Sequence, residues 1–343
     1  MDRKDSFEET GDNGVNIGFS LLVVGGLILV PWAAVAGGNL FFLFSVVIPY
    51  AAFLIFIAGF IYRVVRWGRS PVPFRIPTTC GQQRSLAWIR ANPLESPYTT
   101  WEVVGRMALE LFLFRSLFRN TKLESHGQGI FYGGAKWLWL AGLAFHWSFL
   151  FVVLRHLRFF MDPVLPAVNL LASLDGFFEI GVPAAYLTDG LLLTGVTVLF
   201  LRRVVISHLR YISLPADYFP LFLIFAIAVS GVLLRHFFKV DLLRVKELAI
   251  GLVRFHPVVP EGIAPLFYIH LFLVCVLLVY FPMSKLMHMG GVFLSPTRNL
   301  ANNSRNRRHI NPWNAPVKVH SYAEYEEEFR DKMKAAGLPV EKE

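Results

Sequence analysis

Four histidines within or at the ends of two long apolar segments are the residues of this chain best placed to do chemistry. His146 and His156 lie in the third apolar segment, and His270 and His288 lie in the sixth. An ionisable side chain inside a lipid bilayer is costly, so it usually faces the interior of a helix bundle and serves a function. Four such residues on two segments predict a shared site.

The spacing of these histidines predicts two pairs at different depths. With a rise of about 1.5 Å per residue, His146 and His156 lie about 15 Å apart, and the other two about 27 Å. Antiparallel helices then bring His146 to His288 and His156 to His270. Such pairs can ligate the iron of a haem buried among apolar side chains. We expect two haem b groups with these four ligands; interhelical hydrogen bonds or proton relays are the alternative use.

The two cysteines exclude several other redox centres. Cys80 lies in a polar loop and Cys275 in an apolar segment, so they supply no disulfide framework, iron–sulfur cysteine set or zinc site. No CxxCH motif for covalently attached haem occurs in the sequence. A metal cofactor in this chain must therefore be held by histidine.

Composition places the chain in a membrane. Hydrophobic residues make up 55% of the 343 residues and charged residues only 17%, against about a quarter charged in soluble domains. Six stretches approach or exceed the ~20 residues that cross the hydrocarbon core. They lie at about 17–36, 40–62, 137–159, 181–201, 217–237 and 265–288. We expect an all-α integral membrane fold, a six-helix bundle.

The first two segments predict a helix hairpin, because Gly37, Gly38 and Asn39 make a tight turn between them. Residues 34–36 resemble a signal-peptide cleavage site. The residues before the segment are acidic, however, whereas a cleavable signal begins with basic residues. We therefore expect a retained N-terminal helix.

Basic residues predict the orientation. Six crossings put both termini on one side, which carries 26 of the 33 Lys and Arg residues, against 7 on the other side. Basic loops stay in the cytoplasm, so we expect both termini there, in the inner membrane. The predicted parts are a tail and hairpin at 1–66, a cytoplasmic amphipathic loop at 67–136, a di-haem four-helix core at 137–290 and a cytoplasmic tail at 291–343.

Two segments outside the spans predict surface helices. Charged residues interrupt the apolar positions of 86–122, so this segment does not span the membrane. Beyond Pro97 its pattern predicts an amphipathic helix, which lies on the inner leaflet or binds a partner protein. Ser321 and Glu324 form a capping box, and Gly337 ends the tail helix that follows. The aromatic side chains along one face of this helix could pack against a partner protein or against the residues that follow the helix.

The histidine-bearing segments resemble the nitrate reductase gamma subunit family. The matching stretches are FHWSFLFVVLRH at 145–156 and HLFLVCVLLVYFPMSKLMH at 270–288, whose histidine spacings of ten and eighteen match the family's haem b ligands. The resemblance covers about 137–290. It implies that His146 and His288 ligate the cytoplasmic-side haem, and that His156 and His270 ligate the outer one.

The rest of the chain resembles the DsrM family, the cytochrome b subunits of DsrMKJOP complexes in dissimilatory sulfur metabolism. The motifs are the N-terminal hairpin, FRSLFRNT at 114–121, LSPTRNLANNSR at 294–305 and RHINPWN at 308–314. The resemblance implies electron transfer between menaquinone and a cytoplasmic iron–sulfur subunit, DsrK, related to heterodisulfide reductase. DsrJ, DsrO and DsrP are the further partners that it implies.

The quinone site has a weaker signal. The gamma subunits place a lysine near the outer haem, and this chain has no lysine between His156 and Arg202. The candidate quinone contacts in the outer loop are Arg158, Asp162, Asp175 and Glu179. A solvated loop would contain such residues in any case.

Two alternatives to this function stay open. One is a cytochrome b anchor of another quinone-linked oxidoreductase, which would differ only in its partner. The other is a non-redox transporter or assembly anchor, although no convincing internal repeat of the transporter type occurs. In the main interpretation and in the first alternative, the chain is an electron-transfer subunit of a quinone-linked complex. A reduced-minus-oxidised optical spectrum separates these two from the transporter or anchor.

Overall fold

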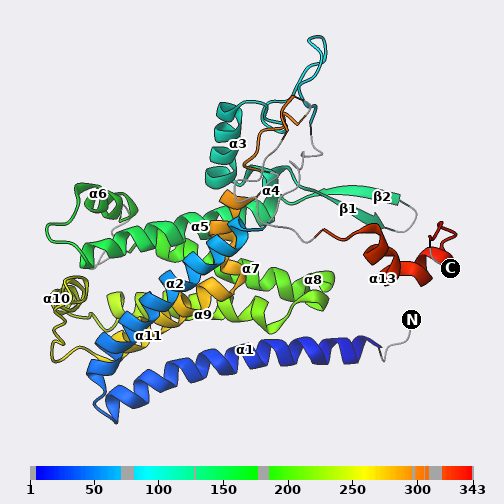
Figure 1. Cartoon of the computed structure of the whole chain (residues 1–343). Helices are drawn as coiled ribbons and strands as arrows, with labels where there is room; N and C mark the ends of the chain where they lie inside the picture. The colour runs from blue at the N-terminus through cyan, green and yellow to red at the C-terminus, as the bar shows by residue number, and fades with distance from the viewer. Residues whose placement is uncertain are drawn as a thin grey trace. The chain divides into compact units, whose positions relative to one another are not determined.

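The protein is a mostly helical chain (Figure 1). The computed structural model describes residues 5–70, 81–126, 129–176, 185–295, 298–304, 306–308 and 319–341. Five helical segments in these ranges are long and apolar enough to cross a membrane: Gly14–Ala36, Leu43–Gly68, Lys136–Phe159, Pro215–His236 and Pro265–Met283. The all-α membrane fold expected from composition is confirmed.

Four helices form the core of the bundle and pack in chain order. Their bounds are Lys136–His156 for α5, Leu187–Val205 for α7, Pro215–His236 for α9 and Pro265–Tyr280 for α11. α5 packs against α7, α7 against α9, and α9 against α11 (Figure 1). Buried Leu192, Val196 and Ile224 join α7 to α9. Leu223 and Leu273 are fully buried between α9 and α11.

The predicted fourth span, at 181–201, is the helix α7, but α7 is not among the five membrane-crossing candidates. It carries the charged residues Asp189, Arg202 and Arg203, and residues 177–184 before it lie outside the described part of the chain. α7 still packs on both sides, against α5 and α9. Asp189 and Arg203 each take part in one of the two polar networks described below.

The N-terminal segments wrap α11. Their bounds are Asp5–Ala36 for α1, Leu43–Val47 for the π-helical η1 and Ile48–Gly68 for α2. The chain turns at 37–39, where Asn39 has a φ of 53°. α1 then packs on α9 and α11. On the other arm, Phe44 of η1 contacts Phe272, and Phe56 of α2 contacts Phe281. One arm of the hairpin and its turn therefore contact α11, and the other arm contacts η3 directly after it.

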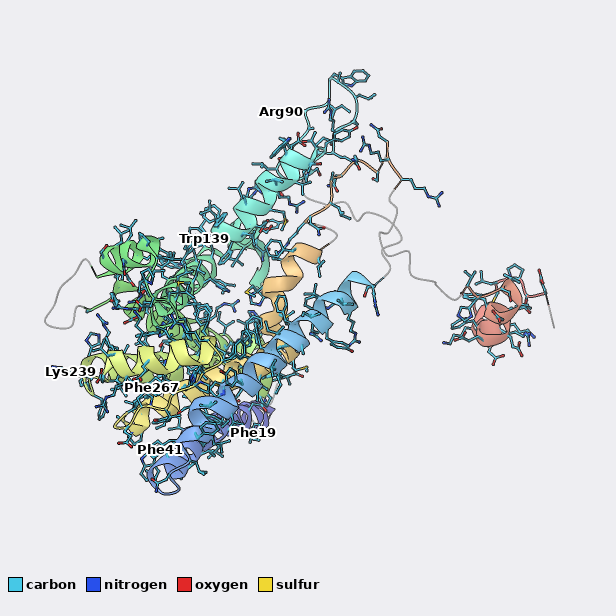
Figure 2. All side chains as sticks on the ribbon, turned by 60° about the vertical axis from the view of Figure 1, so that its left-hand side comes forward. Phe19, Phe41, Arg90, Trp139, Lys239 and Phe267 are labelled. Carbon is cyan, nitrogen blue, oxygen red and sulfur yellow. The ribbon has the colours of Figure 1, made fainter. Side chains whose placement is uncertain are left out.

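Large apolar side chains cover the outside of these helices. Phe19 on α1 is 57% exposed and points away from the bundle (Figure 2). Leu22 and Trp32 on the same helix, and Leu54 on α2, are also exposed. Water would penalise such a surface, whereas lipid tails suit it. These faces are consistent with helices that meet the bilayer directly.

Short elements close the two ends of the core. η2 (Leu157–Phe159), α6 (Pro166–Asp175) and α10 (Leu242–Val253) lie at the end where α5 finishes. α8 (Ser207–Ile212) lies at the opposite end. The elements that follow α11 at that opposite end are η3 (Phe281–Met283), η4 (Lys285–Met287), α12 (His288–Gly291) and η5 (Val292–Leu294).

The predicted amphipathic helix at 86–122 is shorter than expected. Helix α3 spans Thr100–Leu113 and the short α4 spans Arg115–Arg119. An antiparallel hairpin follows, formed by β1 (Thr121–His126) and β2 (Gly129–Gly134). The sequence analysis did not anticipate these strands. They are the one exception to the all-helical pattern in the described residues.

The chain divides into two compact units, 1–63 with 105–292 and 64–104 with 293–343. In the second unit, residues from the predicted loop and the predicted tail pack together. The side chain of Asn302 is buried, its backbone N–H donates to the Pro97 carbonyl, and its own carbonyl accepts a 2.7 Å bond from Gln83. These two segments therefore form one body, although the sequence analysis placed them in separate parts.

The tail helix α13 (Tyr322–Ala335) begins at Ser321, and the predicted capping box with Glu324 is confirmed. Glu326 is buried and accepts a 2.9 Å hydrogen bond from the Glu341 backbone. The chain reverses at Gly337, which has a φ of 68°. The helix therefore packs on its own C-terminal residues, one of the two uses left open by its aromatic stripe.

Candidate functional site

The structure brings the four histidines together in two pairs. The ring centres of His146 and His288 are 5.8 Å apart, and those of His156 and His270 are 6.3 Å apart. The planes of the first pair cross at 81°, and those of the second at 18°. Each pair has one member from α5 and one from α11 or the segment after it.

Both separations fit two imidazoles on opposite sides of one metal ion. A bond of about 2 Å from metal to nitrogen, with about 1.1 Å more to each ring centre, sets the two centres about 6 Å apart. The geometry therefore fits the axial ligation of a haem.

Hydrogen bonds at Nδ1 leave the other ring nitrogen of each histidine for a ligand. The Nδ1 atoms of His146 and His156 lie 2.7 Å from carbonyl oxygens one helical turn earlier, at Gly142 and Val152. That of His288 lies 2.8 Å from the carbonyl of Lys285. A carbonyl only accepts, so each Nδ1 carries the proton and each Nε2 presents a lone pair, as in metal-ligating histidines.

The fourth histidine has its partner on a neighbouring helix. His270 Nδ1 lies 2.9 Å from the hydroxyl of Ser230 on α9, and that hydroxyl donates its own proton to the Ile227 carbonyl at 2.9 Å. Ser230 therefore accepts from His270. A Cβ at Gly231 would lie 3.3 Å from His270 Cε1, tighter than most contacts. Sequence reasoning missed both positions, because a serine and a glycine in an apolar helix carry no strong signal.

Exposure also favours a flat organic cofactor. His146, His156 and His288 are exposed on the surface of the chain itself, although they lie in or beside apolar spans. A bare imidazole there would be costly in lipid. No group of three His, Cys, Asp or Glu residues that could hold a metal ion occurs among the described residues. Haem needs only two protein ligands because the macrocycle supplies the other four.

A buried charge network stands next to His156 in the chain. The pair of His156 and His270 is called the outer pair, and that of His146 and His288 the inner pair, after the sides of the membrane predicted for them. The guanidinium of Arg155 forms ion pairs of 3.1 Å with Asp175 and 2.7 Å with Asp189. Thr188 donates its backbone N–H and its hydroxyl to the two oxygens of Asp175. This network joins α5, α6 and α7. Asp175 is one of the candidate quinone contacts from the sequence analysis, and here each of its oxygens accepts a hydrogen bond from Thr188.

Two guanidinium groups flank Tyr186 at the same end. Arg155 lies 3.6 Å and Arg235 4.0 Å from the ring centre. A cation over an aromatic face is attracted to the ring's negative face. Tyr186 thereby links α5 to the end of α9. This is a second contact between helices beside the outer histidine pair.

The other candidate quinone contacts lie at or beyond the outer end of α5. Arg158 packs over Phe159, and Asp162 is exposed and forms a 3.0 Å ion pair with Lys246. Lys246 comes from α10, which packs on η2 directly after His156. A lysine therefore does reach this region, from the helix α10, which is far away in the sequence. Glu179 lies outside the described residues.

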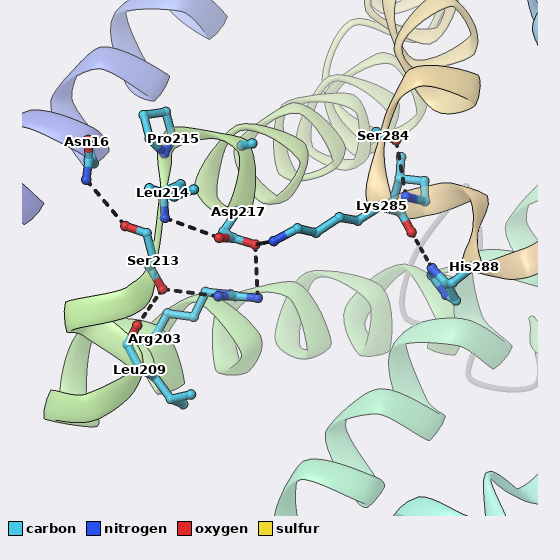
Figure 3. A network of polar contacts seen from close by, with 12 residues as sticks. Asn16, Arg203, Leu209, Ser213, Leu214, Pro215, Asp217, Ser284, Lys285 and His288 are labelled. Carbon is cyan, nitrogen blue, oxygen red and sulfur yellow. Dashed lines mark hydrogen bonds and ion pairs between the residues drawn. The ribbon is translucent and has the colours of Figure 1, made fainter. Parts of the chain in front are cut away.

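A second polar network stands beside the inner pair (Figure 3). Asp217, at the start of α9, lies 2.6 Å from Lys285 Nζ and 3.6 Å from the guanidinium of Arg203. Its other oxygen accepts from the Leu214 backbone. The carbonyl of Lys285 is the partner of His288 Nδ1. The network thus runs from α7 and α9 to a histidine of the inner pair.

Comparison with known proteins agrees with the site. The model of the nitrate reductase gamma subunit family matches residues 99–304. The chain is also 48% identical over 280 residues to the Hdr-like menaquinol oxidoreductase cytochrome b-like subunit of Archaeoglobus fulgidus, covering 79% of this chain and 83% of that protein. The protein of the same name from Archaeoglobus profundus is 43% identical over 275 residues, covering 78% and 81%.

The family match includes both helices of the site and all four histidines, as the resemblance at 137–290 led us to expect. It also extends beyond the core on each side, into the helix α3 and the segment after α12. This membrane protein belongs to the nitrate reductase gamma subunit family.

Proposed function

We propose that this protein is a di-haem cytochrome b subunit that carries electrons between menaquinone and an iron–sulfur partner. One observation carries the proposal: two imidazole pairs, 5.8 and 6.3 Å between ring centres, lie at different depths on the same two helical segments. The names of the Archaeoglobus relatives, menaquinol oxidoreductase cytochrome b-like subunits, support it.

Haem b, when bound, supplies one-electron redox chemistry. In this chain His146 and His288 would hold the inner haem, and His156 and His270 the outer one. The backbone carbonyls and Ser230 keep the Nδ1 protons in place, which fixes the tautomer and the ring orientation of each ligand.

We place the quinone site at the outer end, beside η2. Arg158 and Asp162 follow the outer histidine of α5, and Lys246 reaches Asp162 from α10. A cation and a carboxylate side by side can donate to a quinone oxygen and take up a proton from a quinol. Asp175, also a candidate contact, is ion-paired with Arg155 and accepts two hydrogen bonds from Thr188.

We place the partner on the cytoplasmic side, with both termini. The count of 26 basic residues on that side supports this orientation. We place the docking surface for a soluble subunit on the second unit, in which 81–99 and 298–304 pack together. The DsrM-like motifs make a DsrK-like iron–sulfur subunit the expected partner, with DsrJ, DsrO and DsrP, in sulfur metabolism.

The haem content of the purified protein tests the core of the proposal. We expect two protohaems per chain, both low-spin, in a pyridine haemochrome assay and in a reduced-minus-oxidised spectrum. A ratio near one haem per chain, or a high-spin spectrum, would contradict the two histidine pairs.

Two further measurements test the assigned sides. A quinone analogue should shift the potential of the haem held by His156 and His270, and Lys246→Met should weaken that shift. Truncation before Ser304 should leave both haems in place and release the iron–sulfur partner. An analogue that perturbs only the haem of His146 and His288 would reverse the arrangement.

A further inference from the structure

The ligand His288 differs from the other three histidines in the backbone that carries it. His146 and His156 lie in the continuous helix α5, and His270 lies within α11. α11 ends at Tyr280, eight residues before His288, and Ser284 between them has an extended backbone, with a φ of −114° and a ψ of 178°. The ladder of α11 hydrogen bonds therefore does not fix the position of His288.

The short helix η4 that leads to His288 is held in two other ways. Ser284 caps it by accepting from the Leu286 backbone at 3.1 Å. The side chain of Lys285 reaches sideways to α9, where its Nζ lies 2.6 Å from Asp217 Oδ1 (Figure 3). The carbonyl of the same Lys285 accepts from His288 Nδ1 at 2.8 Å. One residue thus contacts both the fixed helix and the imidazole.

Asp217 is itself held firmly in place. Its side chain is 6% exposed, one oxygen accepts from the Leu214 backbone at 3.2 Å, and Arg203 lies 3.6 Å from the other. The surrounding backbone is tied down by Asn16 of α1, which donates to the Ser213 carbonyl. The Lys285 side chain, in contrast, is 75% exposed. An ion pair with such an exposed partner adds little to the stability of the fold. Its effect here is on the position of the Lys285 backbone.

We propose that Asp217 and Lys285 are positioning residues for the inner haem ligand. Their ion pair holds the carbonyl of Lys285, and this carbonyl sets the plane of the His288 imidazole. The 81° between the planes of His146 and His288 is the geometry that it maintains. This inference rests on the proposed function, because it assigns a role to a neighbour of a proposed ligand.

The angle between the ligand planes gives a direct readout. In low-spin ferric haem with two imidazole ligands, perpendicular planes produce a more anisotropic electron paramagnetic resonance signal than parallel planes. The inner pair at 81° and the outer pair at 18° should therefore give two separate signals. The signal of the inner haem reports the orientation of His288 without any measurement of activity.

The test compares four variants of the full-length protein, purified with its haems. Asp217→Asn and Lys285→Met remove the ion pair from either side, so that one of them serves if the other fails to fold. Lys285→Arg keeps a cation within reach of Asp217. Lys136→Met removes an exposed cation at the same end of the bundle that makes no ion pair with Asp217, and it serves as the matched control.

We expect the largest g value of the inner signal to fall toward that of the outer signal in Asp217→Asn and Lys285→Met. The outer signal should not move. Lys285→Arg and Lys136→Met should keep the native spectrum. An unchanged inner signal in both ion-pair variants, or an equal change in Lys136→Met, overturns the positioning role. Failure of the proposed function is distinguishable, because the unmodified protein, or His288→Ala, would then show the wrong haem content.

Discussion

The two ends of the helix bundle hold their histidine pairs in different ways. At the outer end, Arg155 and Asp175 are 7% and 2% exposed, and their network links α5, α6 and α7. At the inner end, the ion pair to Asp217 depends on Lys285, which is 75% exposed, and the ligand follows a break in the helix. The outer pair is therefore fixed by buried packing, and the inner pair by a contact that solvent can reach.

The different settings suit different tasks. A buried, compensated network resists rearrangement, because removing one partner strands a charge in a dry environment. A solvent-accessible ion pair exchanges partners at little cost. The solvent-accessible ion pair therefore stands beside the inner pair, on the side where we propose that the iron–sulfur partner binds.

The largest effect on this comparison should come from the ligands themselves. His156→Ala or His270→Ala should remove the outer haem alone, and His146→Ala or His288→Ala the inner haem alone, because iron loses one of two axial ligands. Haem content and the two resonance signals measure this. If His146→Ala and His270→Ala removed the same haem, the pairing would be wrong.

Loss of the outer network should have the next largest effect. Arg155→Met leaves Asp175 and Asp189 without their buried cation, so we expect a loss of about 3–5 kcal/mol in the free energy of unfolding. Thermal unfolding in detergent, followed by circular dichroism, measures it. Arg254→Met, which removes an exposed arginine from the same end of the bundle, should change the stability by about 0.5 kcal/mol or less.

The hydrogen bond between α9 and His270 should have a smaller effect, confined to the outer haem. Ser230→Ala removes the acceptor of Nδ1, and such changes typically lower metal affinity about 10- to 100-fold. Haem retention in dilution and the midpoint potential of the outer haem test this. Ser148→Ala is the matched control, since Ser148 is a buried serine whose hydroxyl bonds to a backbone carbonyl. Equal effects of the two variants would remove Ser230 from the site.

The smallest effect on stability is expected at the exposed end of the proposed quinone site. The ion pair of Lys246 with Asp162 has side chains that are 28% and 63% exposed, so Lys246→Met should cost about 0–1 kcal/mol. Chemical denaturation measures this directly. A loss as large as that of Arg155→Met would show that Lys246 serves the fold rather than a ligand.

Much of the architecture could be predicted from the sequence, because apolar length and histidine spacing are local signals. The five crossing candidates agree with five of the six predicted segments to within several residues at their ends. The capping box at Ser321 could also be predicted, because it depends on two residues only three positions apart. The histidine pairing needed only helical geometry, and the structure places the rings accordingly.

What the sequence did not predict depends on contacts between distant residues. Lys246 and Asp162 are 84 positions apart, and Lys285 and Asp217 are 68 apart. The sequence made Asp175 a candidate quinone contact, but it could not show that Asp175 bonds to Thr188 and Arg155. In the two strands β1 and β2, apolar and polar residues alternate only weakly, and β2 contains several glycines. The alternation that normally predicts a strand was therefore too weak to reveal them.

The absence of a side chain at Gly59 couples two parts of the chain mechanically. A Cβ there would lie 2.7 Å from the Cβ of Pro282, so α2 presses directly on the bend that leads to His288. α2 continues past residue 63 into the second unit, where we place the partner. Any shift of α2 at Gly59 would therefore displace Pro282 and, with it, the segment that carries His288.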